Sequence, residues 1–538
     1  MQSLKFPVVG SYSISAKMRD GEATISGVSL DAEVRVHAPL CYSVPVIRCS
    51  GDVTVRLNPL ASSPRSLDSL APSFRGIWLG KDSPFQIGYP TEKFPKKAPL
   101  QPLVVPAEWY KAIGETAASR KDSPVAALVC GPKSSGKSTF SKILGNRMLA
   151  GSQAVLLDLD PGQPEFAPPG ALSLVLLRKP SMSSPFTHPW ADGETASVIR
   201  CHALASVTPA DNPNLFVDVA TSLHELYRER YGHLPLIINT PGWILGLGLE
   251  LLATLIVKLR PTQVIYMSKG GPEDALERLH SACASIGREL ALLPSRQSAI
   301  SPRTAAQLRE MHTMSYFHYL KQAGGYVWSN QPLSHIRPWA IAYKGKNQGI
   351  SAIVSYGPNI TADLAQSIKG MVLAVVEIED VRAFREAGGP DYGNSDKQSN
   401  PLEVLVSRSP EGIPHITISS LDPRFSHMLG LVLIQGVDQE KKQLRILTPM
   451  PSELLNGVSR KGGNLVLVRG KFDPPLWSYT EDAHAKSFRK RNAESDDEEG
   501  EDGVAEGFNR IPFLEALEGS EKRPTGSQTL RIRRDLKN

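Results

Sequence analysis

The chain has 538 residues, a formal net charge of +6, 41% hydrophobic residues and 21% charged residues, which is ordinary for a globular protein of about three or four domains. It has no run of 18 uncharged apolar residues and no signal-peptide core near residue 1, so we expect no membrane association. Five scattered cysteines without a CxxC pair argue against a disulfide framework or a zinc site, and favour a reducing compartment.

Residues 1–100 are predicted to form a β-rich domain. Alternating apolar and polar residues at 23–28 and 33–36 are typical of strands with one buried face. Glycines and prolines separate such runs, which favours a small sandwich or a barrel-like fold. Residues 59–75 are rich in serine and proline, and we expect a loop or a mobile insert there.

Residues 101–330 alternate between helical and strand patterns, which favours a mostly parallel, doubly wound sheet. Because crossovers are right-handed, we expect strand 154–159 to lie directly beside strand 125–130. Apolar runs predict strands at 125–130, 154–159, 172–177, 234–239 and 263–267, and helical periodicity predicts helices at 109–118, 212–231, 248–258, 272–290 and 304–321.

A glycine-rich loop joins the first of these strands to a helix and fits G-x-x-x-x-G-K-[ST] without a mismatch. Glycines let the backbone curl so that N–H groups point at phosphate oxygens, and the helix start adds a positive dipole end. Lys137 is expected to reach the β- and γ-phosphates of a nucleoside triphosphate, and Ser138 to bind Mg²⁺. The alternative, a chance match, is disfavoured by the flanking strand and helix. The expected nucleotide-binding residues are Gly131, Pro132, Lys133, Ser134, Ser135, Gly136, Lys137, Ser138 and Thr139.

Two aspartates follow the next strand, in Asp158-Leu159-Asp160-Pro161-Gly162-Gln163. Residues i and i+2 project to one side of a strand, and ligands bind at the carboxyl ends of parallel strands. One carboxylate there could hold Mg²⁺ or its waters, and the other could accept a proton from an attacking hydroxyl. A turn with two solvated aspartates is the alternative. Gln163 is expected to contact the second substrate, whose hydroxyl would accept the phosphoryl group.

A third polar motif, Asn239-Thr240-Pro241-Gly242-Trp243, also follows an apolar strand. Asn stands where GTPases have Asp in a similar turn, and the chain has no N-K-x-D guanine motif, which argues against a GTPase. Trp243 suits stacking on a nucleobase, with burial in the core as an equal alternative. We expect Thr240 and Trp243 to contact the acceptor.

Arginines near 295–320 are candidates for a lid. Arg303 and Arg309, with Arg296 nearby, lie just before and within the predicted helix 304–321. Arginines on a mobile segment can close over a nucleotide and neutralise charge on the transferred phosphoryl group. A solvated helix face is the alternative.

Residues 331–482 return to a β-rich pattern, so a second β domain is expected there. Residues 384–401 have the composition of a disordered insert. Residues 483–538 are predicted to form an acidic tether, with its acidic run at 494–506, followed by a docking tail; a plain disordered terminus is the alternative. The candidate strands are 349–354, 371–377, 431–437, 442–447 and 464–468.

Four stretches, GPKSSGKST, VLLDLDPGQPEF, INTPGW with GLGLELL, and SPRTAAQLREMHTMSYFH, occur in the order and spacing of the RNA polynucleotide 5′-hydroxyl kinases, and the chain resembles that family. DPGQPEF, NTPGW and the tail LRIRRDLKN bring it closer to the ribosomal-RNA-processing branch (the Grc/Nol type) than to the pre-mRNA branch (the Clp type). The resemblance covers the centre of the chain strongly and the flanking β domains loosely.

This resemblance implies a central P-loop kinase domain between two β-rich domains, with the N-terminal domain on the adenine side of ATP. Asp160 matches the family's hydroxyl-activating carboxylate, and Trp243 a substrate-clasping position. Arg303 and Arg309 resemble lid arginines, in a lid poorer in arginine than the Clp type. The expected catalytic residues are Lys137, Asp160, Arg303 and Arg309, and the expected metal ligands are Ser138 and Asp160.

The resemblance also implies a process and a partner. The ribosomal branch works bound to a Las-type endoribonuclease, which leaves a 5′-hydroxyl in the second internal transcribed spacer, so we expect a nucleolar, higher-order complex contacted through the C-terminal tail. The leading hypothesis is an ATP-dependent kinase acting in line on the 5′-OH of RNA, with Asp160 as the base. The alternatives are a P-loop scaffold that stabilises the nuclease assembly without transfer, and a small-molecule kinase or synthetase of similar core.

Overall fold

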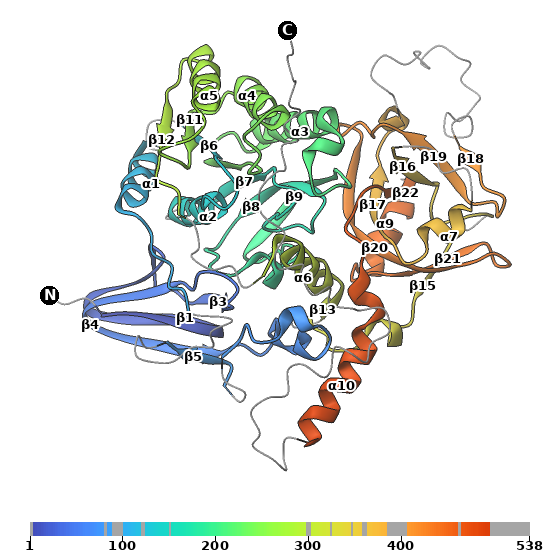
Figure 1. Cartoon of the computed structure of the whole chain (residues 1–538), viewed down its shortest axis with the longest axis horizontal. Coiled ribbons are helices and arrows are strands. Elements are labelled where there is room, and N and C mark those ends of the chain that lie inside the picture. Colours follow the sequence, from blue (N-terminus) through green and yellow to red (C-terminus); the bar gives the residue numbers. More distant parts are fainter. Residues whose placement is uncertain are drawn as a thin grey trace, which may run out of the picture.

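Three parts follow one another along the chain in this computed structural model, as the colours of Figure 1 show. A blue N-terminal sheet lies beside a green and teal α/β part, and an orange C-terminal sheet lies beyond helix α6 (Ala305–His318). This arrangement confirms the predicted P-loop domain between two β-rich regions. None of the helices in the described ranges is long and apolar enough to cross a membrane. The structure describes residues 4–79, 83–88, 100–119, 124–149, 152–296, 303–322, 325–345, 348–357, 363–384, 406–460 and 464–494.

The N-terminal sheet is built around one long strand, β1 (Leu4–Ile25). Residues 4–6 and 23–25 of this strand both pair antiparallel with residues 47–49 of β4, so the sheet curls onto itself in a barrel-like manner. Val8, Tyr12 and Ile14 of β1 are buried inside the curl. The other strands are β2 (Val28–Ser29), β3 (Val34–Ala38), β4 (Val46–Pro59) and β5 (Phe85–Ile87).

The prediction of a mobile insert at residues 59–75 is wrong. The segment forms two 3₁₀ helices, η1 (Pro64–Ser69) and η2 (Pro72–Phe74), which bury Leu67 and Phe74 completely. Each helix begins with proline, whose fixed φ suits a first helical position. The serines and prolines therefore start helical turns that pack on the core.

The central sheet has the strand order β12-β11-β6-β10-β7-β8-β9. It is parallel as far as β7, and β8 and β9 are antiparallel additions. The prediction that β7 lies directly beside the P-loop strand β6 is wrong, because β10 pairs with both and separates them. β10 is apolar on both faces, as a strand in the middle of a covered sheet must be. The strands are β6 (Ala126–Cys130), β7 (Ala154–Asp158), β8 (Ala171–Leu177), β9 (Ala196–Ala203), β10 (Leu236–Asn239), β11 (Gln263–Tyr266) and β12 (Leu290–Leu292).

Helices cover both faces of the central sheet, as predicted for a doubly wound fold. Trp109 of α1 and Phe140 of α2 pack against one face, and Leu223 of α3, Leu255 of α4 and Leu279 of α5 pack against the other. The helices are α1 (Ala107–Ser119), α2 (Lys137–Met148), α3 (Pro213–Arg230), α4 (Leu247–Leu259) and α5 (Glu273–Ser285), with short 3₁₀ turns η3 (Pro185–Thr187) and η4 (Pro209–Asp211).

The C-terminal sheet has the strand order β15-β21-β20-β17-β22-β16-β19-β18. One face packs against Leu364 of α7 and Val458 of α9, and the other joins the core around α6. Apart from Phe384, the predicted insert at 384–401 lies outside the described residues. The elements are β13 (Tyr319–Gln322), β14 (Gly325–Trp328), η5 (Leu333–His335), β15 (Trp339–Ala342), β16 (Ala352–Tyr356), α7 (Leu364–Ile368), β17 (Val372–Ile378), η6 (Val381–Phe384), β18 (Ser407–Arg408), β19 (Pro414–Ile418), β20 (Ser426–Asp438), β21 (Gln443–Leu447), α9 (Ser452–Arg460), β22 (Asn464–Arg469) and η8 (Leu476–Tyr479).

Helix α6 joins the three parts. Its Met311, Met314 and Phe317 share one core with Phe74 of η2 and Val376 of β17. A further helix, α10 (Glu481–Glu494), packs near the C-terminal end of α6. The predicted tether at 483–538 therefore begins as a helix, and residues 495–538 lie outside the described part of the chain.

Candidate active site

The glycine-rich loop at residues 131–139 turns sharply between β6 and α2. Gly131, Ser134 and Gly136 have φ values of 142°, 62° and 98°. Such turns align successive N–H groups into a concave surface that binds anions. At Gly136 no side chain fits, because a Cβ atom would lie 2.6 Å from the ring of Trp109. The backbone therefore has the shape that the motif predicted.

Lys137 and Ser138 form the first turn of α2. Lys137 is buried, and its Nζ donates a hydrogen bond to the carbonyl of Pro132 at 2.9 Å, inside the loop. Burial lowers the pKa of Lys137, and the nearby Asp160 carboxylate opposes this change. Ser138 is exposed at the positive end of the helix dipole. The lysine and the serine thus lie where a triphosphate and its metal would be bound.

The turn after β10 forms a second wall against the loop. A Cβ atom on Gly242 would come 2.7 Å from Cα of Lys133 and 3.1 Å from Nζ of Lys137, so glycine alone fits this close approach. Thr240 is buried, and its hydroxyl donates to the carbonyl of Val129 at 2.9 Å. The Thr240 hydroxyl, a candidate for substrate contact, is therefore engaged in joining β10 to β6.

Trp243 is half-buried at the carboxyl edge of the sheet. Its indole packs over Gly248 at the start of α4, where an added Cβ atom would lie 2.3 Å from the ring. The ring also borders a small apolar space with Phe216 and Leu251. One part of the Trp243 side chain is therefore packed in the core, and the other part remains accessible to solvent.

Asp158 is fully buried at the end of β7. Its Oδ1 accepts a hydrogen bond from Asn239 Nδ2 at 2.9 Å, and its Oδ2 accepts one from the Glu165 N–H at 2.7 Å. Burial raises the pKa of Asp158 to about 7, although these hydrogen bonds oppose the change. The Asp158 carboxylate therefore holds the loop that follows it, up to Glu165.

Asp160 lies in the Pro161–Gly162 turn. Its Oδ1 accepts the N–H groups of Gly162 at 3.0 Å and Gln163 at 3.3 Å, which fixes the carboxylate. Burial raises the pKa of Asp160. The positive charge of Lys137 is the largest influence that lowers this pKa, and the charge of Arg309 also lowers it. Asp160 is therefore within electrostatic range of the loop lysine and, more weakly, of the α6 arginine. A carboxylate in that place can accept a proton from a hydroxyl attacking the bound phosphate.

The residues at this edge fit a magnesium ion. Asn239 Oδ1 is buried and has no hydrogen-bond partner among the described residues, and it lines a small cavity with Ser138 and Gln163. A buried acceptor beside a serine hydroxyl and carboxylates suits a metal-bound water. The described residues contain no cluster of three or more His, Cys, Asp or Glu side chains that could hold a metal by itself.

The two candidate lid arginines lie in different surroundings. Arg309 of α6 is mostly buried, and its Nε donates to Asp473 Oδ2 at 2.6 Å. Arg303 donates instead to the backbone carbonyls of Ser73 at 2.8 Å and Arg75 at 2.7 Å, so it fastens the start of α6 to η2. Of the two, Arg309 is the arginine whose charge influences Asp160.

A cavity of about 280 Å³ lies beside the loop, where Gly136 and Thr139 form one wall. Trp109 and Arg296 line it from the α/β part, and Ser43 lines it from the N-terminal domain. The backbone N–H of Arg296 also donates to the Ser135 carbonyl at 2.9 Å. A partly aromatic cavity next to a phosphate loop suits the base of a nucleotide.

The sequence motifs left out several residues that contribute here. Trp109 lies in the helix that precedes the P-loop strand. A large aromatic side chain at the start of that helix was the signal in the sequence that could have pointed to its role. Asp473 holds Arg309 from a distant part of the chain and belongs to no motif. Glu165 follows the DPGQ turn, and its buried partners are visible only in the fold.

A phosphate loop with a buried lysine, a carboxylate facing that lysine and an arginine from a separate helix define a P-loop phosphotransferase. Residues 131–319 match the family model for the P-loop of the mRNA cleavage and polyadenylation factor CLP1. Two solved structures that contain Clp1p and Pcf11p share the fold, with TM-scores of 0.51 and 0.52 at 14% and 15% identity. In each, the match covers 87% of this chain and 98% of the matched chain.

Curated relatives are more similar in sequence. The polynucleotide 5′-hydroxyl-kinase GRC3 of Gibberella zeae is 40% identical, over 99% of this chain and 79% of the relative. The corresponding kinase of Aspergillus niger is 33% identical, over 92% of this chain and 68% of the relative. The chain belongs to the Grc3 family of polynucleotide 5′-hydroxyl kinases.

Proposed function

We propose that this chain transfers the γ-phosphoryl group of ATP to the 5′-hydroxyl end of RNA. The observation that carries the proposal is that the phosphate loop after β6 and the Asp160 turn after β7 lie at the same carboxyl edge of the parallel sheet. There Lys137 opposes the rise in the pKa of Asp160, and Arg309 on α6 opposes it more weakly. The names of the relatives supply the reaction class. The three side chains supply a phosphate ligand, a proton acceptor and a charge for the transferred group.

The reaction follows from these positions. The loop N–H groups and Lys137 bind the β- and γ-phosphates, and Lys137 exchanges its hydrogen bond to Pro132 for a phosphate oxygen. The 5′-hydroxyl oxygen attacks the γ-phosphorus in line, the bond to the β–γ bridging oxygen breaks, and ADP leaves. The hydroxyl proton passes to Asp160, whose Oδ2 takes no part in the hydrogen bonds that fix Oδ1. Arg309 neutralises charge on the transferred group.

Mg²⁺ is the cofactor that this chemistry implies. Ser138 and Asp160 are the residues that would hold it, and Asn239 Oδ1 would accept a hydrogen bond from one of its waters. When bound, the ion neutralises charge on the β- and γ-phosphates. Gln163 and Trp243 lie at the same edge of the sheet and are the proposed contacts for the terminal nucleotide.

The proposed biological substrate is pre-ribosomal RNA. A Las-type endoribonuclease would leave a 5′-hydroxyl in the second internal transcribed spacer, and this kinase would phosphorylate it before exonuclease entry. The proposal rests on the DPGQPEF and NTPGW motifs and on the Grc3 names of the relatives. We further propose that the protein works in a higher-order complex in the nucleolus, within the nucleus, and that residues 483–538 contact the nuclease. A fluorescent fusion of the full chain that avoids the nucleolus would contradict this part.

The transfer reaction is tested with the full chain and its Las-type partner, ATP labelled in the γ-phosphate and a 5′-hydroxyl RNA. We expect label at the RNA 5′ end, none on 5′-phosphorylated RNA, and none with Lys137→Ala. Lys269→Ala is the matched control, because this exposed lysine pairs only weakly, with Glu108 on the surface. If the wild type assembles with its partner but transfers no label, the proposal fails and the scaffold alternative stands.

A further inference from the structure

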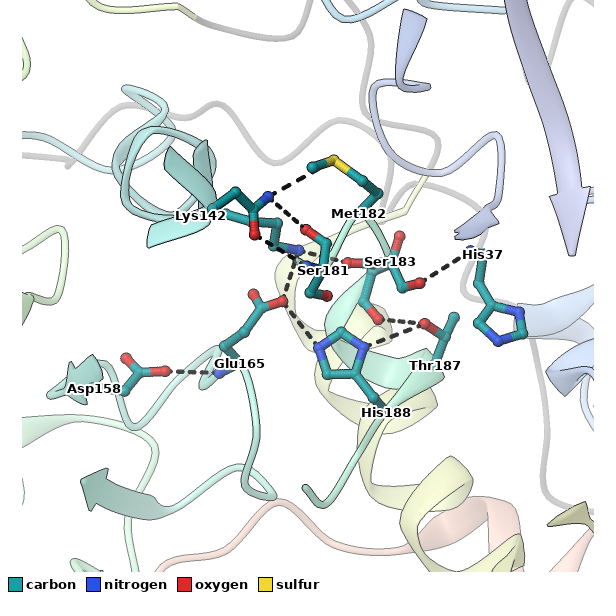
Figure 2. A network of polar contacts seen from close by, with 11 residues as sticks. His37, Lys142, Asp158, Glu165, Ser181, Met182, Ser183, Thr187 and His188 are labelled. Carbon is teal, nitrogen blue, oxygen red and sulfur yellow. Dashed lines mark hydrogen bonds and ion pairs between the residues drawn. The ribbon is translucent and has the colours of Figure 1, made fainter. Parts of the chain in front are cut away.

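Two members of an ionic cluster, Lys142 and Glu165, line the same small cavity as Ser138, Gln163 and Asn239. Figure 2 shows Glu165 between Lys142 and His188, with dashed lines to both. Glu165 Oε1 is 2.6 Å from Lys142 Nζ, and it accepts a hydrogen bond from His188 Nε2 at 2.9 Å. The three side chains are 12–20% exposed. The mechanism above uses none of them.

Such a cluster is costly to bury unless its charges are compensated. Burial alone would raise the pKa of Glu165, but Lys142 and His188 outweigh burial and lower it to about 2. Glu165 is therefore a carboxylate at neutral pH. A buried ion pair can often be replaced by apolar residues without loss of stability, so stability alone is a weak reason for charges here.

The backbone of Glu165 connects the cluster to the catalytic loop. Its N–H donates to Asp158 Oδ2 at 2.7 Å, and Asp158 Oδ1 accepts the Asp160 N–H at 3.3 Å. The segment from Asp158 to Glu165 is thus closed by a hydrogen bond between its two ends. Asp160 lies inside this closed loop, so a shift of Glu165 shifts the carboxylate that faces Lys137.

The side chain of Glu165 fastens this loop to the elements around the phosphate. Lys142 lies one turn after Ser138 on α2, so its ion pair fixes the loop relative to the start of that helix. On the other side, His188 directly follows η3, which packs against α6, and His188 influences His312 of α6 electrostatically. His312 is one turn after Arg309. Glu165 therefore connects the helix of the phosphate loop, the catalytic loop and the lid helix.

The geometry points to Glu165 as a positioning residue for phosphoryl transfer: its carboxylate, held by Lys142 and His188, keeps the Asp160 loop aligned with the start of α2 and with α6. This inference rests on the proposed function for its reaction. A displacement of about 1 Å between reacting groups costs about 10²-fold in rate. Glu165→Gln should therefore lower kcat by about 10²-fold and leave the KM for ATP nearly unchanged.

The test compares Glu165→Gln with Glu194→Gln in the full chain with its nuclease partner. Glu194 is the matched control, because its ion pair with Lys179 at 2.6 Å is about half exposed. Hydrogen exchange gives a readout that does not need transfer: the N–H groups of Asp160, Gly162 and Glu165 should exchange faster in Glu165→Gln and remain unchanged in Glu194→Gln. Unchanged kcat and unchanged exchange in folded Glu165→Gln would overturn the inference.

A double variant separates positioning from stability and serves also if Glu165→Gln is unstable. Glu165→Leu with Lys142→Met replaces the buried ion pair by apolar side chains, so the melting temperature should return towards wild type. We expect kcat to remain low, since apolar packing cannot fix the loop by directed hydrogen bonds. Recovery of kcat together with stability would reduce Glu165 to a structural role. Failure of wild-type transfer would instead overturn the proposed function, and the exchange readout would still test the loop.

Discussion

Replacing Arg309 by glutamine should slow phosphoryl transfer far more than it weakens the fold. The Arg309 side chain is 19% exposed and lies 2.6 Å from Asp473, whose side chain is 42% exposed. A pair with one partner in contact with water contributes about 1 kcal/mol or less to stability. A loss of that size leaves a protein of ordinary stability folded. The variant therefore reports on the site.

The effect on rate follows from the position of Arg309. The positive charge of Arg309 opposes the rise in the pKa of Asp160, the proposed base, so Arg309 is the proposed source of charge for the transferred phosphoryl group. A donor aimed at charge that develops in the transition state is worth about 3–4 kcal/mol, which is about 10²- to 10³-fold in kcat. The KM for ATP should change little, because Lys137 and the loop backbone bind the ground state.

Single-turnover transfer to 5′-hydroxyl RNA measures this prediction. Arg303→Gln is the matched control, since it removes the same charge near the same helix but its guanidinium donates to the Ser73 and Arg75 carbonyls. The control should lower the melting temperature without the large loss of kcat. Wild-type kcat in Arg309→Gln, or equal losses in both variants that follow their stability, would refute the reasoning.

Three further predictions concern the loop, the base and the buried cluster. Gly136→Ala would place a Cβ atom 2.6 Å from Trp109 at a φ of 98°, so ATP affinity by calorimetry should fall, whereas Gly114→Ala, with open space around it, should leave affinity unchanged; equal affinities would contradict the loop geometry. Because burial raises the pKa of Asp160 above 3.8, kcat should decline on acidification at a higher pH than for an ordinary aspartate, and Asp160→Asn should abolish this acid limb. An acid limb that survives in the variant would belong to another group. Burial would raise the pKa of Glu165, but Lys142 and the hydrogen bond with His188 lower it from 4.5 to about 2. The stabilisation by the ionised carboxylate is therefore complete above pH 4.5 and is lost as the pH falls towards 2. Urea unfolding of Glu165→Gln should lack this acid-dependent part, and an identical pH dependence in both proteins would count against the ion pairs.

The loop and the main helices could be predicted because their signals are local. The spacing of Gly131, Gly136 and Lys137 dictates a phosphate-binding turn whatever surrounds it. Helix α3 begins after the cap residue Asn212, whose side chain accepts the Leu215 N–H. Such features involve residues a few positions apart, so the sequence determines them directly.

The strand order and the partners of charged residues could not be predicted in this way. β10 fits between β6 and β7 through packing of residues about 80 to 110 positions away, which no local pattern records. The same holds for the separation of Arg303 from Arg309, which depends on η2 and on Asp473. Residues 59–75 have a loop composition, and tertiary burial of Leu67 orders them.

The most direct test of the central claim is a side-by-side transfer of labelled γ-phosphate to 5′-hydroxyl RNA by the wild type and by Asp160→Asn, each with the proposed nuclease partner. We predict that the variant still binds ATP with Mg²⁺, because Lys137, Ser138 and the loop backbone remain and asparagine keeps one side-chain oxygen for the metal. Its kcat should be lower by about 10²- to 10⁴-fold, the usual contribution of a general base. Full transfer by Asp160→Asn would contradict the assignment of the base, and no transfer by the wild type would contradict the kinase itself.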